Sequence, residues 1–161
     1  MSLASSSPPR SAPPAQAAPG APSTSWTARQ QRERAYYEQY ARRTPVEDVG
    51  FDPVLSPERR PWNSYWDAYR VVADLYDPTA RRLLDVGTGE GVAAVRYAKV
   101  GYEVWGFDIS DRNVRKARDL AARHGLSDRT RFSVQVAEDL PYDDDSFDVV
   151  TGIDILHHVD I

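Results

Sequence analysis

A glycine-rich turn, Asp85-Val-Gly-Thr-Gly-Glu-Gly91, is the feature of this sequence that most constrains the fold. An apolar run over 83–86 precedes the turn and predicts a short strand, and residues 91–99 after it predict a helix. Gly87 permits the tight turn, Gly89 lets the backbone approach a ligand, and Gly91 lets the helix lie against the strand. A glycine turn between a strand and a helix is typical of sites that bind a nucleotide or a nucleoside.

The alternation of strand and helix continues to the end of the chain. Further strands are predicted over 102–107, 131–136 and 147–152, with a helix over 111–124 and a partly helical segment over 156–161. Ser110 is a suitable N-cap for the helix, and Gly125 fits the position just after its end. Strands that alternate with helices pair in parallel through right-handed crossovers. We therefore predict an α/β fold with a doubly wound parallel sheet of about four strands.

The region before this alternation differs in composition. Residues 1–25 are nearly all Ser, Pro and Ala, which predicts a disordered tail; because no acid occurs before Glu33, a transit peptide is the alternative. Residues 26–79 form a predicted helical cap region, with helices over 27–43 and 62–76. The second helix carries an aromatic stripe at helical spacing, which either packs into the core or forms a lid over a ligand. Residues 80–161 form the third predicted unit.

An acid follows the glycine turn at a distance that suits a nucleoside site. Asp108 ends the second predicted strand, where a carboxylate can accept hydrogen bonds from both ribose hydroxyls of an adenosine; its alternative role is a favourable charge at the start of the next helix. Val92 stands where a dinucleotide turn needs its third glycine. Asp85 and Glu90 place negative charge around the turn, which would repel a pyrophosphate and favour a sulfonium or ammonium group. The charge favours S-adenosylmethionine over NAD, and an NAD-dependent oxidoreductase is the alternative enzyme.

Three segments together resemble a known family. LLDVGTGEG, VWGFDIS and VAEDLPYDDDSFDVVTGIDILHHV resemble, in order and spacing, the motifs of class I S-adenosylmethionine-dependent methyltransferases, and are most similar to the "type 11" group that methylates small molecules. The resemblance covers residues 80–161. It implies a Rossmann-like fold, S-adenosylmethionine as cofactor, and transfer of a methyl group to a small-molecule acceptor by in-line displacement.

The resemblance also implies roles for particular residues. The turn residues would line the methionine and ribose, Asp108 would bind the ribose hydroxyls, and Ile109 would pack on the adenine, whose edge would meet Ala137 and Glu138. The family often has Asp or Asn where this chain has Val136, so Glu138 or Asp139 is expected to reach the adenine amino group. The helix that carries Tyr36, Tyr37 and Tyr40 is similar to one that closes over the cofactor. The predicted cofactor-binding residues are Asp85, Gly87, Thr88, Gly89, Asp108, Ile109, Ala137 and Glu138.

Other chemistry has weaker support in the sequence. Adjacent His157 and His158 point in different directions on a helix, and the run of acids over 143–145 lacks the spacing of a calcium loop, so we expect no metal site. The sequence names no catalytic base. Asp154, His157 and His158 are candidates, because they follow the fourth predicted strand at the edge where ligands bind such sheets.

The net charge of the chain indicates which partners to expect, and its length indicates how much of the sheet is present. The net charge is −4, and residues 138–161 contain no Lys or Arg, so we expect no nucleic-acid partner. No apolar stretch reaches the ~18 residues of a membrane span, and we expect a cytoplasmic protein. A sheet of this class has about six strands, with a seventh in the methyltransferases. We therefore expect a fragment or a truncated gene product, inactive by itself as an enzyme, with a non-catalytic cofactor-binding module as the other possibility.

Overall fold

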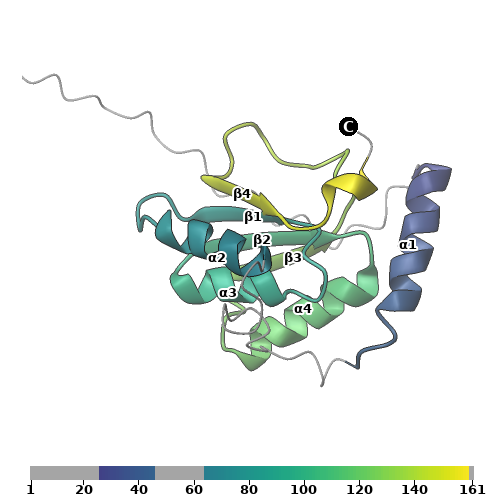
Figure 1. Cartoon of the computed structure of the whole chain (residues 1–161), viewed down its shortest axis with the longest axis horizontal. Helices are drawn as coiled ribbons and strands as arrows, with labels where there is room; N and C mark the ends of the chain where they lie inside the picture. Colours follow the sequence, from purple (N-terminus) through teal and green to yellow (C-terminus); the bar gives the residue numbers. More distant parts are fainter. Residues whose placement is uncertain (1–25, 46–63, 160–161) are drawn as a thin grey trace, which may run out of the picture.

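The computed structural model describes residues 26–45 and 64–159 (Figure 1). Its centre is a parallel sheet of four strands in the order β3-β2-β1-β4. The strands are β1 (Arg82–Val86), β2 (Glu103–Asp108), β3 (Thr130–Val134) and β4 (Val149–Gly152). The helices are α1 (Ala28–Tyr40), α2 (Ser64–Asp74), α3 (Val92–Val100), α4 (Asp111–Arg123) and a 3₁₀ helix, η3 (Leu156–His158). The predicted Rossmann-like α/β fold is confirmed.

The two faces of the sheet carry two apolar cores. Helices α2, α3 and α4 lie together on one face, where the larger core includes the buried side chains of Leu83, Val95, Tyr97 and Leu120 (Figure 1). On the other face, Trp105 packs edge-on against Phe147 at a ring distance of 5.6 Å. Burial of apolar area on both faces is what parallel sheets require. The two cores thereby hold the sheet that carries the carboxyl-terminal ends of the strands.

Capping residues close to the helices in the sequence determine where the helices begin and end. Thr27 and Gln30 form a reciprocal capping box at the start of α1. Ser110 caps α4 by accepting a hydrogen bond from the Asn113 backbone N–H, as predicted. Gly125 follows the end of α4 with a φ of +66°, so its predicted place after the helix is also confirmed.

Several predicted boundaries were wrong by a few residues. The first helix ends at Tyr40 and the second at Asp74, and the start predicted for the second lies outside the described residues. The third strand ends at Val134, and the fourth begins at Val149. In the segment predicted as partly helical over 156–161, residues Leu156–His158 form a 3₁₀ turn, and residues 160–161 lie outside the described residues. The tail over 1–25 also lies outside the described residues.

The aromatic stripe of α2 serves the core and also reaches the site. Tyr69 stacks on the buried Tyr97 at a ring distance of 6.2 Å, and Val72 is buried. Tyr65, one turn earlier, is exposed and lines a cavity described below. The predicted packing into the core is therefore confirmed for Tyr69 and Val72, whereas a lid over a ligand stays a prediction.

Strand β4 lies at one edge of the sheet and β3 at the other. Among the residues described, β4 pairs with β1 alone, and Val150 on it is 63% exposed. In 26–45 and 64–159, no helix is long and apolar enough to cross a membrane.

Gly91 lies where the start of α3 contacts α4. A Cβ there would lie 2.6 Å from the Cβ and 2.7 Å from the Cα of Ala117 in α4, and its φ is +84°. This glycine was predicted to let the helix lie against the strand, and that reason was wrong. The close approach is between the start of α3 and α4.

Substituting Gly91→Ala should lower the free energy of unfolding by about 2–4 kcal/mol, from the left-handed backbone together with overpacking. Gly125→Ala is the matched control, because Gly125 has a φ of +66° with nothing within 4 Å of an added Cβ. Gly125→Ala should lower the free energy of unfolding only by the cost of the left-handed backbone, about 1–2 kcal/mol. Urea denaturation measures both, and equal losses in the two variants would contradict the contact with Ala117.

Candidate functional site

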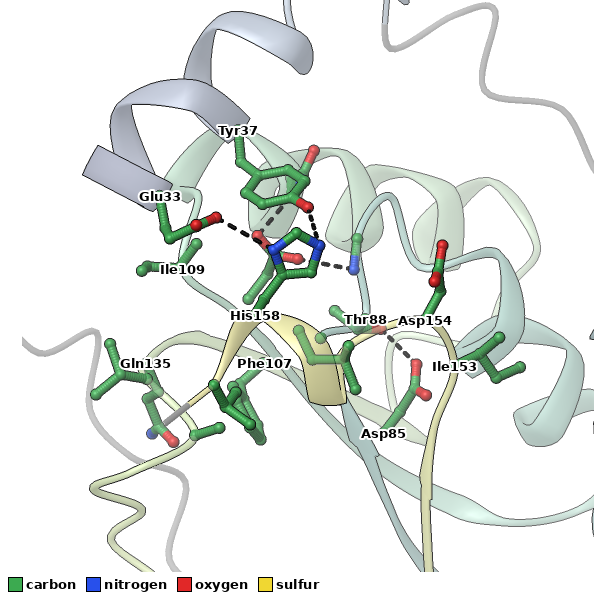
Figure 2. Close-up of a pocket in the computed structure, with 18 of the residues that line it drawn as sticks. Glu33, Tyr37, Asp85, Thr88, Phe107, Ile109, Gln135, Ile153, Asp154 and His158 are labelled. Atoms are coloured by element: carbon green, nitrogen blue, oxygen red, sulfur yellow. Dashed lines mark hydrogen bonds and ion pairs between the residues drawn. The ribbon is translucent and has the colours of Figure 1, made fainter. Parts of the chain in front are cut away.

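A cavity of about 610 Å³ lies at the carboxyl-terminal ends of the strands (Figure 2). The β1–α3 turn, the end of β2, the segment after β3 and the segment after β4 line it, and α1 covers one side. Every predicted cofactor-binding residue lines this cavity: Asp85, Gly87, Thr88, Gly89, Asp108, Ile109, Ala137 and Glu138. The volume is within the usual range for small-molecule sites.

At the glycine turn, backbone without side chains lines the cavity. Gly87 and Gly89 have φ values of +67° and +54°, which L side chains rarely adopt. A Cβ on Gly87 would lie 2.7 Å from Ile155 Cδ1, so a side chain at this position would require Ile155 to shift. A Cβ on Gly89 would meet nothing within 4 Å. The Gly89 backbone therefore faces open space in which a ligand fits.

The Asp85 carboxyl lies buried beneath the turn. Its Oδ2 accepts a hydrogen bond from Thr88 Oγ1 at 2.7 Å, as Figure 2 shows. Burial raises the pKa of Asp85 to about 7, although the bond from Thr88 acts in the opposite direction, and the charge of Asp108 raises it slightly further. Near neutral pH this carboxyl is therefore only partly ionised.

Asp108 joins the glycine turn to the start of α4. Its Oδ2 accepts a hydrogen bond from the Gly89 N–H at 3.0 Å, and its Oδ1 accepts from the Ser110 N–H at 2.8 Å and from Asn113 Nδ2 at 3.2 Å. Burial raises the pKa of Asp108, and these three bonds counteract part of the rise. Each carboxylate oxygen has two lone-pair directions, so Oδ2 keeps capacity for a ligand hydroxyl.

The charge around the turn differs from the sequence prediction. Glu90 does line the cavity, but its Oε1 lies 2.5 Å from the Nζ of Lys116, whose side chain is only 2% exposed. This ion pair neutralises Glu90. The predicted repulsion of a pyrophosphate by two free carboxylates was therefore wrong, and only the partly ionised Asp85 acts from within the turn.

Helix α1 covers the cavity through polar side chains. Gln30 Nε2 donates to Glu138 Oε2 at 3.1 Å, and Glu38 Oε1 accepts from Ser110 Oγ and from the Arg112 N–H, both at 3.1 Å. The predicted similarity to a cofactor-covering helix agrees with this position beside the cavity. Of the two acids that were expected to reach an adenine, Glu138 lines the cavity and Asp139 does not.

Several lining residues were missed by the sequence analysis. They include Gln30, Glu33, Asn113 and Gln135. Gln30, Glu33 and Tyr37 are spaced three and four residues apart and therefore share one face of α1, a signal that could have identified the first two. Nothing in the sequence places that face over the strand ends.

The two adjacent histidines have different surroundings. His158 lines the cavity, with Tyr37 Oη 2.8 Å from its Nε2 and Glu33 Oε2 3.3 Å from its Nδ1. His157 is 60% exposed, does not line the cavity, and has Asp154 Oδ1 at 3.7 Å from its Nδ1. No group of His, Asp and Glu in the described ranges could hold a metal ion.

A sequence model of the methyltransferase domain family matches residues 83–161. This segment contains the glycine turn, Asp108 and the histidines. Residues 83–161 belong to the methyltransferase domain family.

The relatives of this methyltransferase domain act on diverse compounds, to judge by their names. A 27-O-demethylrifamycin SV methyltransferase of Amycolatopsis mediterranei (strain S699) is 43% identical over 79 residues, which cover 48% of this chain and 29% of the relative. A ubiquinone biosynthesis O-methyltransferase of Roseobacter denitrificans is 33% identical over 132 residues, which cover 79% of this chain and 52% of the relative. The chain thus spans between about a third and half of these relatives.

A solved structure shares the fold beyond the domain itself. The magnesium protoporphyrin IX methyltransferase of Synechocystis PCC 6803, crystallised with bound SAM, superposes with a TM-score of 0.62 at 22% sequence identity. The match covers 86% of this chain and 67% of that protein. At this identity the likeness shows the fold.

The buried Asp85 predicts a pH-dependent stability. The folded protein holds a proton on Asp85 up to about pH 7, whereas an unfolded chain releases it near pH 3.8. The free energy of unfolding should therefore fall as the pH rises between these values, by up to about 4 kcal/mol from this group. Asp85→Asn cannot titrate and should show a flatter pH dependence.

Urea denaturation at several pH values between 4 and 8 measures this slope. Asp128→Asn, on an exposed loop position, is the control and should keep the slope of the unsubstituted protein. An equal slope in Asp85→Asn and in the unsubstituted protein would show that the carboxyl titrates without a cost from burial.

Proposed function

We propose that the chain binds S-adenosylmethionine in the cavity and belongs to an enzyme that transfers the methyl group to a small-molecule acceptor. The observation that carries the proposal is the convergence of the glycine turn and Asp108 on one cavity of about 610 Å³ at the strand ends. Ligands of doubly wound sheets bind at this edge. When bound, S-adenosylmethionine supplies an electrophilic methyl group on a sulfonium.

The residues of the cavity fit this ligand. Gly89 leaves space beside its backbone, and Asp108 Oδ2 retains capacity for a ribose hydroxyl. Ile109 and Ala137 offer apolar surface for an adenine, with Glu138 beside them. Asp85 lies beneath the turn, where its negative form would attract a cationic ligand group. In this proposal the protein supplies position and electrostatics, and the methyl donor supplies the reactivity.

A small-molecule acceptor fits the charge of this part of the chain. The lining includes Glu33, Glu138 and Asp154, whose carboxylates would repel the phosphates of a nucleic acid. The named relatives include an N-methyltransferase of norajmaline and O-methyltransferases of ubiquinone biosynthesis. The absence of a nucleic-acid partner and the cytoplasmic location stay predictions.

Calorimetry with S-adenosylhomocysteine tests the proposal directly. The unsubstituted protein should bind it, and Asp108→Ala should weaken binding by about 10–100-fold, because a charged hydrogen-bond acceptor is lost. Asp108→Asn keeps the size of the side chain and should weaken binding in the same direction. Asp111→Ala, at the exposed first turn of α4, is the matched control and should bind like the unsubstituted protein.

Cooperative thermal unfolding of each variant shows whether its fold is kept. Binding of NAD in place of S-adenosylhomocysteine would contradict the proposal and favour an oxidoreductase. Tight, salt-sensitive binding of DNA or RNA would contradict the small-molecule acceptor.

A further inference from the structure

A chain of three side chains crosses the wall of the cavity between α1 and η3. Glu33 and Tyr37 lie one turn apart on α1, and His158 lies in η3 (Figure 2). Glu33 Oε2 is 3.3 Å from His158 Nδ1, and Tyr37 Oη is 2.8 Å from His158 Nε2. All three side chains line the cavity. An imidazole held between a carboxylate and a hydroxyl is the arrangement by which proteins prepare a general base.

The ion-pair contact with Glu33 and the hydrogen bond with Tyr37 together assign the tautomer of the imidazole. A carboxylate can only accept a hydrogen bond, so the Nδ1 that faces Glu33 carries the hydrogen. A neutral imidazole has one N–H, which leaves a lone pair on Nε2. Burial, followed by the charge of Glu33, raises the pKa of Tyr37, so its hydroxyl stays protonated and donates to that lone pair. His158 thereby presents a basic nitrogen on the cavity side.

The other acids of the cavity are less suited to this role. Asp85 lies beneath the turn, and its Oδ2 is engaged by Thr88. Asp108 already accepts three hydrogen bonds from the protein. Asp154 is 72% exposed and faces His157. Among the described lining residues, only His158 has a carboxylate beside one ring nitrogen and a hydroxyl that donates to the lone pair of the other.

We propose that His158 is the general base of the methyl transfer, that Glu33 positions it in the Nδ1–H tautomer, and that the acceptor is a neutral hydroxyl or amine compound. This inference rests on the function proposed above. The hydroxyl of Tyr37 occupies the place that the acceptor hydroxyl takes in the loaded site. Tyr37 then remains beside the acceptor as a second hydrogen-bonding group.

The step balances with the groups named. The acceptor oxygen or nitrogen forms its bond to the methyl carbon, the carbon–sulfur bond breaks, and its electron pair stays on sulfur. The acceptor proton passes to His158 Nε2, and the imidazolium that forms is stabilised by Glu33. An acceptor that is already an anion has no need of this base, so the site selects compounds that must lose a proton to become the methylated product.

The tautomer of His158 gives a test that needs no acceptor. Nuclear magnetic resonance of ¹⁵N-histidine-labelled protein should show His158 as the Nδ1–H tautomer. Glu33→Ala should convert it to a mixture of the two tautomers, and Glu33→Gln, which keeps a carbonyl acceptor, should restore the Nδ1–H form. A role of Glu33 in folding alone would leave the tautomer unchanged in variants that remain folded, and that result would overturn the assignment of Glu33.

A second test uses para-nitrophenol, a hydroxyl compound whose anion absorbs visible light, added to the complex with S-adenosylhomocysteine. Proton transfer to His158 should increase the ratio of anion to neutral phenol among bound molecules by about ten-fold over free solution at the same pH. His158→Asn should abolish this increase. His157→Asn, the same substitution one residue earlier and outside the cavity, should keep it.

The outcomes separate this inference from the proposed function. Failure of the unsubstituted protein to bind S-adenosylhomocysteine in calorimetry refutes the proposed function itself. Binding of S-adenosylhomocysteine by the unsubstituted protein and by His158→Asn, with no bound para-nitrophenol or with equal ionisation in both, refutes only the role of His158. Loss of the anion in His158→Asn alone supports it.

Discussion

The site depends on the carboxylate of Asp108. Its hydrogen bonds reach the glycine turn through the Gly89 N–H and the start of α4 through Ser110 and Asn113. One side chain at the end of β2 therefore fixes the position of the turn after β1 and of the next helix. Desolvation of this carboxylate is costly, and three donors compensate for part of the cost. The bonds to Ser110 and Asn113 agree with the other role predicted for Asp108, a favourable charge at the start of α4, while its contact with a ribose stays a prediction.

Much of this arrangement could be predicted because its determinants are local. The glycine turn, the apolar strands and the caps at Ser110 and Gly125 are each encoded within a few consecutive residues. Right-handed crossovers then restrict how such units assemble, which is why the strand ends and the site residues on them meet at one edge. The boundaries of β3 and β4 were less predictable, since strand ends depend on the partner strand as well as on the sequence of the strand itself.

The parts that could not be predicted depend on contacts between distant residues. Lys116 is an ordinary helix residue in the sequence, and only the packing of α3 on α4 brings it to Glu90. The contact of Gly91 with Ala117 arises in the same place. Similarly, the partners of His158 come from a helix more than a hundred residues earlier in the chain. No periodic pattern within either segment indicates that the two segments come into contact.

The way in which α1 is attached has a consequence for exchange of ligands. None of its residues is buried, and hydrogen bonds and ion pairs at Gln30, Glu33, Tyr37 and Glu38 attach it to the rest of the domain. Detachment of the helix would expose little apolar surface, and water can replace the polar partners, so local opening costs far less than unfolding of the core. Backbone amides of α1 should therefore exchange with deuterium sooner than those of α4. Substitutions on α1 can then alter the rate at which a ligand leaves while the sheet keeps its stability.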